Sequence, residues 1–215
     1  MLRSVRSYLS LFGKVDERIL KAMEKIDRKD FIEDNYYFDD AMPIGYGQTI
    51  SQPNTVGRML ALLELRKGNK VLEIGTGSGW NAALIGYIVK PGKVLSLERI
   101  DELCVKAREN IKRYNLRNIK IENKDFRKLK EKFDRITLTA GISYWQEKVI
   151  EELVGKILKK NGILVCPYRS GPLLILKNKP FLKKKSLKGK EEKQNAKISK
   201  EHTNEEYAFV PLVFD

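Results

Sequence analysis

Residues 71–79 read VLEIGTGSG, and this stretch decides the fold that we expect. Its apolar start, 71–74, is typical of a short buried strand. The alternating glycines that follow, Gly75, Gly77 and Gly79, are typical of a tight turn into a helix, because glycine adopts a positive φ and lets the backbone come close to a ligand. Open parallel sheets bind ligands at the carboxyl ends of their strands. The stretch therefore predicts a ligand-binding edge of an α/β domain.

Downstream of this turn, segments of helical pattern alternate with short apolar runs. We expect helices over 80–89, 101–114 and 146–158, the last one stopped by Asn161-Gly162, and strands at 94–98, 119–121, 133–138 and 163–166. This alternation predicts a doubly wound α/β fold with a mostly parallel sheet and helices on both faces. Two further apolar runs flank a lysine-rich stretch and predict a C-terminal antiparallel hairpin at the sheet edge, with strands at 173–176 and 207–213.

Upstream of the turn, the pattern indicates helices and an irregular loop. Apolar residues at spacings of three and four predict two short helices within residues 4–27. Pro43, Gly45 and Gly47 argue against a regular element in the segment that follows. Pro53 is suited to the first turn of another helix, and Ser51 is a plausible N-cap just before it.

We expect a single compact unit made of two parts. Residues 1–66 would form an N-terminal helical cap with its loop, packed on an α/β domain over 67–215. No stretch approaches the roughly 20 apolar residues that span a bilayer, so no membrane partner is expected. The basic start of the chain, 1–6, is followed by no apolar signal core. A cytoplasmic protein is the expectation.

The positive charge of the chain is concentrated in one place. The formal net charge is +14, and the stretch from Lys177 to Lys200 carries +8 of it, with ten lysines, two glutamates and no arginine. Arginine is the residue that pairs best with bases and phosphates. We therefore interpret this stretch as a solvated basic hairpin or mobile loop. Contacts with a polyanion or with another subunit are the alternatives.

The scarcity of histidine and cysteine excludes several kinds of chemistry. Cys104 and Cys166 are the only cysteines, lie far apart and lack metal-ligand spacing, so we expect buried free thiols and no metal. His202 is the only histidine, which argues against a zinc site and against a histidine-based nucleophilic triad. The reaction, if there is one, must proceed without an imidazole.

Two acids near the glycine turn bear on the nature of the ligand. Glu73 lies next to the end of the first strand, where a carboxylate would attract a cationic amino group and repel a pyrophosphate. Glu98 ends the second strand, 19 residues after Gly79, and suits both hydroxyls of a ribose. Because NAD and S-adenosylmethionine both contain a ribose, Glu98 locates a cofactor without identifying it. The glycines could also serve only to tighten the turn.

Asp125 and Phe126 follow the third strand of the expected sheet. The carboxylate could accept a hydrogen bond from an adenine amino group, and the ring could pack against the base. A surface acid or a helix-capping acid is the alternative interpretation of Asp125.

Residues 43–53, PIGYGQTISQP, resemble the signature of the protein-L-isoaspartate O-methyltransferase family. The glycine turn follows at the spacing of that family, and the likeness, close from about Arg28 to Glu98, resumes at 209–212, FVPL. The resemblance implies a Rossmann-like fold and methyl transfer from S-adenosylmethionine, with no metal, to the carboxylate of L-isoaspartyl residues in damaged proteins or peptides. The methyl ester then collapses to a succinimide, part of which reopens as aspartate.

The resemblance also implies roles for individual residues. The hydroxyl of Ser51 would hydrogen-bond the reacting carboxylate under a loop formed with Thr49 and Ile50, and Val210 would lie along the substrate backbone. The cofactor would be held by Glu73, Gly75, Thr76, Gly77, Ser78, Glu98, Asp125 and Phe126. A carboxylate is ionised at neutral pH and needs no general base, which suits a chain with one remote histidine. Ser51 could also be only an N-cap.

The second half of the chain departs from the family pattern. Residues 139–145 read TAGISYW where the family has a small, proline-containing run, and 167–172 lack its usual glycine and glutamines. Two alternatives therefore stay open. One is a nucleic-acid methyltransferase, such as a tRNA adenine methylase, which would explain the net charge of +14. The other is a binding protein that has kept the cofactor fold and lost catalysis.

Overall fold

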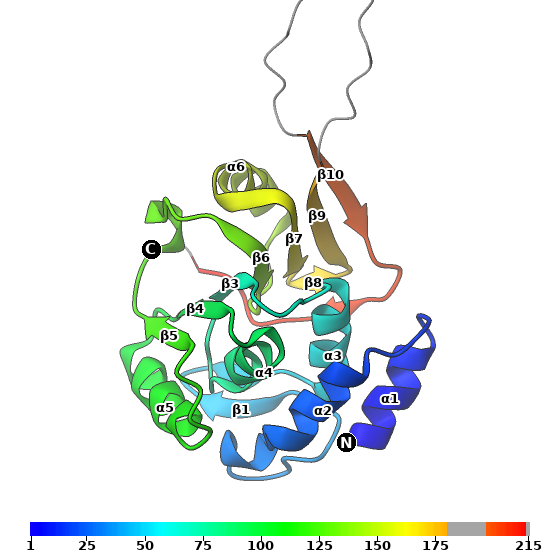
Figure 1. Ribbon diagram of the computed structural model, residues 1–215, viewed down its shortest axis with the longest axis vertical. Helices are drawn as coiled ribbons and strands as arrows, with labels where there is room; N and C mark the ends of the chain where they lie inside the picture. The colour runs from blue at the N-terminus through cyan, green and yellow to red at the C-terminus, as the bar shows by residue number, and fades with distance from the viewer. Residues whose placement is uncertain (180–196, 214–215) are drawn as a thin grey trace, which may run out of the picture.

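A seven-stranded sheet forms the centre of the computed structural model, which describes residues 1–179 and 197–213 (Figure 1). Its strands, in spatial order, are β10 (Lys197–His202), β9 (Leu173–Lys179), β7 (Leu158–Pro167), β6 (Phe133–Leu138), β3 (Lys70–Ile74), β4 (Lys93–Leu97) and β5 (Ile119–Glu122). The five strands from β7 to β5 are parallel, and β9 and β10 are antiparallel to their neighbours. The predicted doubly wound, mostly parallel sheet is confirmed.

Helices cover both faces of this sheet (Figure 1). They are α1 (Leu2–Ser10), α2 (Glu17–Lys25), α3 (Pro53–Leu62), α4 (Trp80–Val89), α5 (Asp101–Lys112) and α6 (Glu147–Ile157). Alternate residues of β3 point to opposite faces. Val71 therefore packs in a core with the first five helices, whereas Leu72 and Ile74 pack in a second core with α6. The two cores hold the carboxyl ends of the strands in fixed positions.

A short hairpin precedes α3, although the sequence argued against a regular element there. β1 (Met42–Gly45) pairs antiparallel with β2 (Gln48–Ile50). The expectation was wrong because the turn itself uses the left-handed conformation, with φ of 56° at Tyr46 and 67° at Gly47. The hairpin carries the segment that enters α3.

The expected helix boundary before β7 also needs correction. Asn161 and Gly162 do not separate a helix from a strand, because α6 ends at Ile157 and β7 begins at the next residue. Asn161 has a φ of 62° and lies within β7, where the register with β6 shifts. The turn signal in the sequence thus marks an irregularity inside a strand.

The C-terminal hairpin is present, but its second strand is not the expected one. β9 pairs with β10, and the expected strand at 207–213 is reduced to β11 (Tyr207–Ala208), which pairs with β8 (Ser170–Gly171). The lysine-rich stretch contributes its ends to β9 and β10, and its middle part, 180–196, lies outside the described residues. Beyond β11 the chain follows the loop after β6, where the amide of Gly141 donates to the carbonyl of Val210 at 2.7 Å.

Several absences follow from the described part of the chain. Within residues 1–179 and 197–213, no helix has the length and apolar character needed to cross a membrane. In the same residues no three side chains of metal-ligating type are grouped. Cys104 and Cys166 are free cysteines, and both are buried.

Candidate functional site

Two adjoining cavities open at the carboxyl ends of β3, β4 and β6. The strand-end cavity, of about 760 Å³, is lined by residues that follow β4 and β5, among them Arg99, Asn123 and Asp125. The loop cavity, of about 610 Å³, is lined by residues 48–51 and by the glycine turn. Both volumes include space that is open to solvent. The two cavities share Gln48, Gly75, Glu98 and Ala140.

The glycine turn after β3 forms the floor shared by both cavities. Gly75 has a φ of 98° and Gly77 a φ of 53°, both in the region that side chains disfavour. A Cβ on Gly75 would also collide with the hydroxyl of Thr139. The amides of Gly75 and Thr76 donate to the carbonyl of Leu97, which fixes the turn against the end of β4. The backbone of the turn therefore requires glycine at these positions, whether or not a ligand is bound.

Glu98 joins the glycine turn to the start of α5. Its Oε2 accepts from the amide of Gly77 at 2.9 Å, and its Oε1 accepts from the amides of Arg99 and Ile100 at 2.9 and 3.1 Å. The carboxylate is 8% exposed and lies on the wall of both cavities. A carboxylate has about four acceptor positions, so this arrangement leaves one for a ligand rather than the two expected for both ribose hydroxyls.

Glu73 is fully buried beneath the glycine turn and lines neither cavity. Its Oε1 accepts from the Asn81 amide at 2.8 Å, and its Oε2 accepts from the hydroxyl of Ser96, which in turn is 2.6 Å from that of Thr76. We expected Glu73 to hold the cofactor directly. This expectation is corrected, because the buried carboxylate lines neither cavity. The carboxylate supports the turn from below, and Asn81 stands between it and the loop cavity.

The burial of Glu73 predicts a pH-dependent stability. Burial raises the pKa of Glu73 to about 7 from its ordinary value of 4.5, and the charge of Glu98 adds to the rise. Between these two values the unfolded chain has lost the proton that the folded chain keeps, so this carboxyl makes the protein less stable as the pH rises through that window.

Glu73→Gln removes this titration. We expect the thermal midpoint of Glu73→Gln, relative to the wild type, to rise by about 3 °C or more between pH 5 and pH 8. Thermal unfolding at both pH values measures it, with Glu152→Gln on the exposed side of α6 as the matched control. An equal offset at both pH values would show that Glu73 titrates as it does in the unfolded chain.

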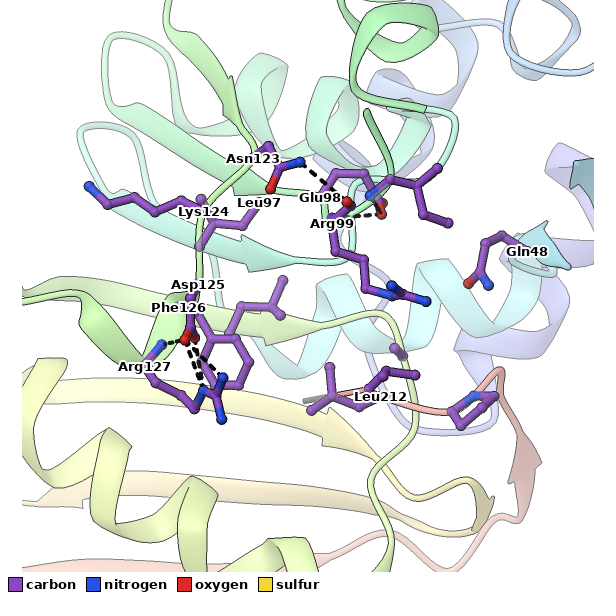
Figure 2. A pocket seen from close by; sticks show the side chains of 16 residues that line it. Gln48, Leu97, Glu98, Arg99, Asn123, Lys124, Asp125, Phe126, Arg127 and Leu212 are labelled. Atoms are coloured by element: carbon purple, nitrogen blue, oxygen red, sulfur yellow. Dashed lines mark hydrogen bonds and ion pairs between the residues drawn. The ribbon is translucent and has the colours of Figure 1, made fainter. Parts of the chain in front are cut away.

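Asp125 and Phe126 lie side by side on the wall of the strand-end cavity (Figure 2). Asp125 caps the short 3₁₀ helix η2 (Phe126–Lys128), accepting from the Arg127 amide at 2.9 Å, and it also pairs with the Arg127 guanidinium. This pairing holds the pKa of Asp125 below its usual value. The capping interpretation is therefore correct for this acid, which at the same time faces the cavity.

The segment 49–51 forms one wall of the loop cavity, and Val210 is on the cavity wall as well. Ser51 is not the cap of α3: the N-cap is Gln52, whose side chain accepts from the Thr55 hydroxyl at 3.1 Å but makes no capping bond to the helix backbone. Asp39, in the loop before β1, caps the helix instead, because its Oδ1 accepts from the amide of Asn54 at 2.9 Å. The Ser51 hydroxyl is thus not used for capping.

Several residues of the site were not foreseen from the sequence. Arg99, Asn123 and Lys124 line the strand-end cavity, and Trp80, Asn81, Thr139 and Ala140 line the loop cavity. Asn81 is the second residue of α4, in the first turn after Gly79, where helix N-termini bind ligands, and this signal could have identified it. Thr139 and Ala140 belong to the divergent loop after β6, which has no pattern of its own.

The comparisons with known proteins agree with this geometry. Residues 8–214 match the family model described as Protein-L-isoaspartate(D-aspartate) O-methyltransferase (PCMT). The protein-L-isoaspartate O-methyltransferase of Fervidobacterium nodosum is 42% identical over 178 residues, covering 79% of this chain and 86% of the relative. That of Thermosipho melanesiensis is 38% identical over 214 residues, covering 96% and 98%.

A solved structure agrees on the fold alone. The crystal structure of a putative protein-L-isoaspartate O-methyltransferase from Plasmodium falciparum, in complex with S-adenosyl-L-homocysteine, superimposes with a TM-score of 0.74. It is 24% identical and covers 98% of this chain and 97% of its own.

Proposed function

This chain belongs to the protein-L-isoaspartate O-methyltransferase family, and from this premise we propose that its strand-end cavity binds S-adenosylmethionine while its loop cavity binds the carboxylate of an L-isoaspartyl residue. The chain is accordingly an S-adenosylmethionine-dependent protein carboxyl O-methyltransferase. The observation that carries the assignment of the two cavities is their shared wall at Gly75, Glu98 and Ala140. Two reactants bound in these cavities would lie next to each other where the cavities share lining residues. This arrangement provides the proximity that methyl transfer needs.

The residues around the strand-end cavity fit this cofactor. Gly75 lies on the wall of this cavity and has no side chain, so its backbone can approach a ligand closely. Glu98 keeps one acceptor position for a ribose hydroxyl, and its carboxylate makes this edge of the sheet suited to a cation. Asp125 and Phe126 line this cavity where they would contact the adenine. Thr76, Gly77 and Ser78 of the turn line the adjoining loop cavity, where they would contact the part of the cofactor that reaches the lining shared by the two cavities. When bound, S-adenosylmethionine supplies a methyl group activated by its sulfonium charge.

The residues of the loop cavity would bind and orient the acceptor. The Ser51 hydroxyl donates a hydrogen bond to the acceptor carboxylate, and Thr49 and Ile50 close the wall around it. Val56 and Met59 provide apolar surface that keeps water from the carboxylate. Because the acceptor is already ionised, no residue has to remove a proton.

The substrates would be damaged proteins or peptides that contain L-isoaspartate, in which the methyl ester leads to a succinimide and so begins repair.

The test is incubation with S-adenosylmethionine labelled in its methyl group. An isoaspartyl peptide, the same peptide with aspartate, and bulk tRNA serve as separate acceptors. We expect label only in the isoaspartyl peptide, released as methanol by base. Label in tRNA would support the nucleic-acid alternative, and label in none would support a catalytically inactive cofactor-binding protein. A cytoplasmic location stays a prediction.

Glu98→Ala is expected to weaken cofactor binding by about 1–3 kcal/mol, since it removes the partner of a ribose hydroxyl and releases three backbone amides. Titration calorimetry with S-adenosylhomocysteine measures the loss. Glu102→Ala, at an exposed acid in the first turn of α5, is the control and should bind as the wild type does. An unchanged affinity in Glu98→Ala would remove Glu98 from the cofactor site.

A further inference from the structure

Arg28 is a buried arginine that lies behind the loop cavity. Its side chain is 0% exposed, although the sequence places it in a highly charged segment. Its guanidinium donates to four backbone carbonyls: Nη1 to those of Tyr36 and Phe38 at 3.0 and 3.1 Å, and Nη2 to those of Asp40 and Ser51 at 2.8 and 3.2 Å. Four carbonyl dipoles thus take the place of a carboxylate partner.

These four carbonyls come from both sides of the β1–β2 hairpin. Residues 36–40 precede the hairpin, and Ser51 follows it directly. The guanidinium therefore joins the two ends of the hairpin, which presents residues 48–51 to the cavity. Loss of this contact would free the segment that contains the proposed carboxylate donor.

Arg28 also contacts a second residue that lines the loop cavity, Trp80. Its guanidinium carbon lies 5.5 Å from the ring centroid of Trp80, which lines that cavity at the start of α4. The indole of Trp80 donates to the carbonyl of Ile26 at 3.1 Å, two residues before Arg28. Arg28 therefore connects the hairpin to the helix that follows the glycine turn.

The charge of Arg28 is retained at neutral pH. Burial lowers the pKa of Arg28 to about 10, and the carboxylates of Asp39 and Asp40 oppose the decrease. Only a guanidinium has the planar set of N–H groups that serves four acceptors at once, because a lysine ammonium is a point charge with three donors. The site is specific for arginine in its geometry as well as in its charge.

We propose that Arg28 is a positioning residue for methyl transfer, which fixes the backbone of Ser51 so that its hydroxyl is aligned with the acceptor carboxylate. This inference rests on the function proposed above. A buried arginine with this many contacts also stabilises the fold, so the test must separate stability from alignment.

Arg135 provides a matched control within the same chain. It is 7% exposed and likewise donates to four backbone carbonyls, those of Leu63, Glu64, Asp134 and Asn161. It lies near the amino end of β6, at the opposite end of the strands from the two cavities. Arg135→Lys therefore removes the same kind of contacts without touching the proposed site.

The experiment compares Arg28→Lys, Arg135→Lys and the wild type. For each protein it measures the thermal midpoint, the affinity for S-adenosylhomocysteine, and kcat and KM for an isoaspartyl peptide. It also measures the amide hydrogen exchange of residues 48–52. We expect similar losses of thermal stability in the two variants. Only Arg28→Lys should lower kcat, by about 10²-fold, with KM and the cofactor affinity changed less than about threefold, because misalignment affects the reaction more than binding. Exchange at 48–52 should increase in Arg28→Lys alone.

A decrease of kcat in Arg28→Lys no larger than in Arg135→Lys would overturn the proposal, as would unchanged exchange at 48–52. If Arg28→Lys does not fold, Arg28→Gln replaces it with the same expectations. A wild-type protein that leaves the isoaspartyl peptide unmethylated contradicts the proposed function, and the exchange measurement then decides whether Arg28 holds the loop. The two failures are therefore distinguishable.

Discussion

Ser51→Ala is expected to lower kcat/KM for an isoaspartyl peptide by about 10- to 150-fold, the equivalent of one hydrogen bond to a charged group worth about 1.5–3 kcal/mol. The hydroxyl is free for this role because Gln52 and Asp39, rather than Ser51, serve the start of α3. The carbonyl of the same residue is fixed by Arg28, so the loop should keep its place when only the hydroxyl is removed.

Two measurements distinguish a lost donor from a damaged site. The affinity for S-adenosylhomocysteine should stay within about twofold of the wild type, because the hydroxyl contributes to the loop cavity alone. Ser51→Thr keeps a hydroxyl and should retain part of the activity. If Ser51→Ala keeps full activity, the donor must be sought among the backbone amides of the loop.

Much of the fold could be predicted because the relevant signals are local. The bounds of β6 and α4 and the left-handed glycines of the turn follow from runs of apolar residues and from the freedom of glycine itself. The last strand could not be predicted in this way. Residues 207–213 read as a strand, yet the amide of Phe209 donates to the carbonyl of Arg169, and the carbonyl of Val210 and the amide of Leu212 bond to Gly141. The partner of β9 is instead the polar strand β10, which has a weak signal of its own.

In the candidate site, too, local sequence patterns predict some features, whereas features that depend on tertiary packing are not predicted. Gly75 and Glu98 were located by spacing along the chain, because both follow directly from the ends of neighbouring parallel strands. The direction of a side chain is not encoded by such spacing. Glu73 points toward Ser96, and the guanidinium of Arg28 bonds backbone carbonyls within residues 36–51. The directions of both side chains depend on packing between separate segments, and no local sequence pattern predicts that packing.

Gly75→Ala is expected to have the largest effect on cofactor binding. The backbone at this position has a φ of 98°, which is strained for any residue with a Cβ, and the new methyl group would collide with the Thr139 hydroxyl. That hydroxyl cannot easily move away, because it donates to the carbonyls of Ile74 and Gly75. We expect strain of about 1–3 kcal/mol in the turn. We further expect S-adenosylhomocysteine to bind about 30- to 150-fold more weakly, or about 2–3 kcal/mol.

Two further variants test whether the effect is specific to the backbone at Gly75. Gly155→Ala, on the exposed side of α6 with open space around it, should raise stability by about 0.5–1 kcal/mol and leave cofactor affinity unchanged. Thr139→Ala, combined with Gly75→Ala, removes the colliding oxygen but not the backbone strain, so it should restore only part of the lost affinity. If Gly75→Ala binds as tightly as the wild type, the turn adapts to a side chain and does not approach the cofactor closely. Full restoration by Thr139→Ala would instead assign the whole effect to the collision and none to the positive φ.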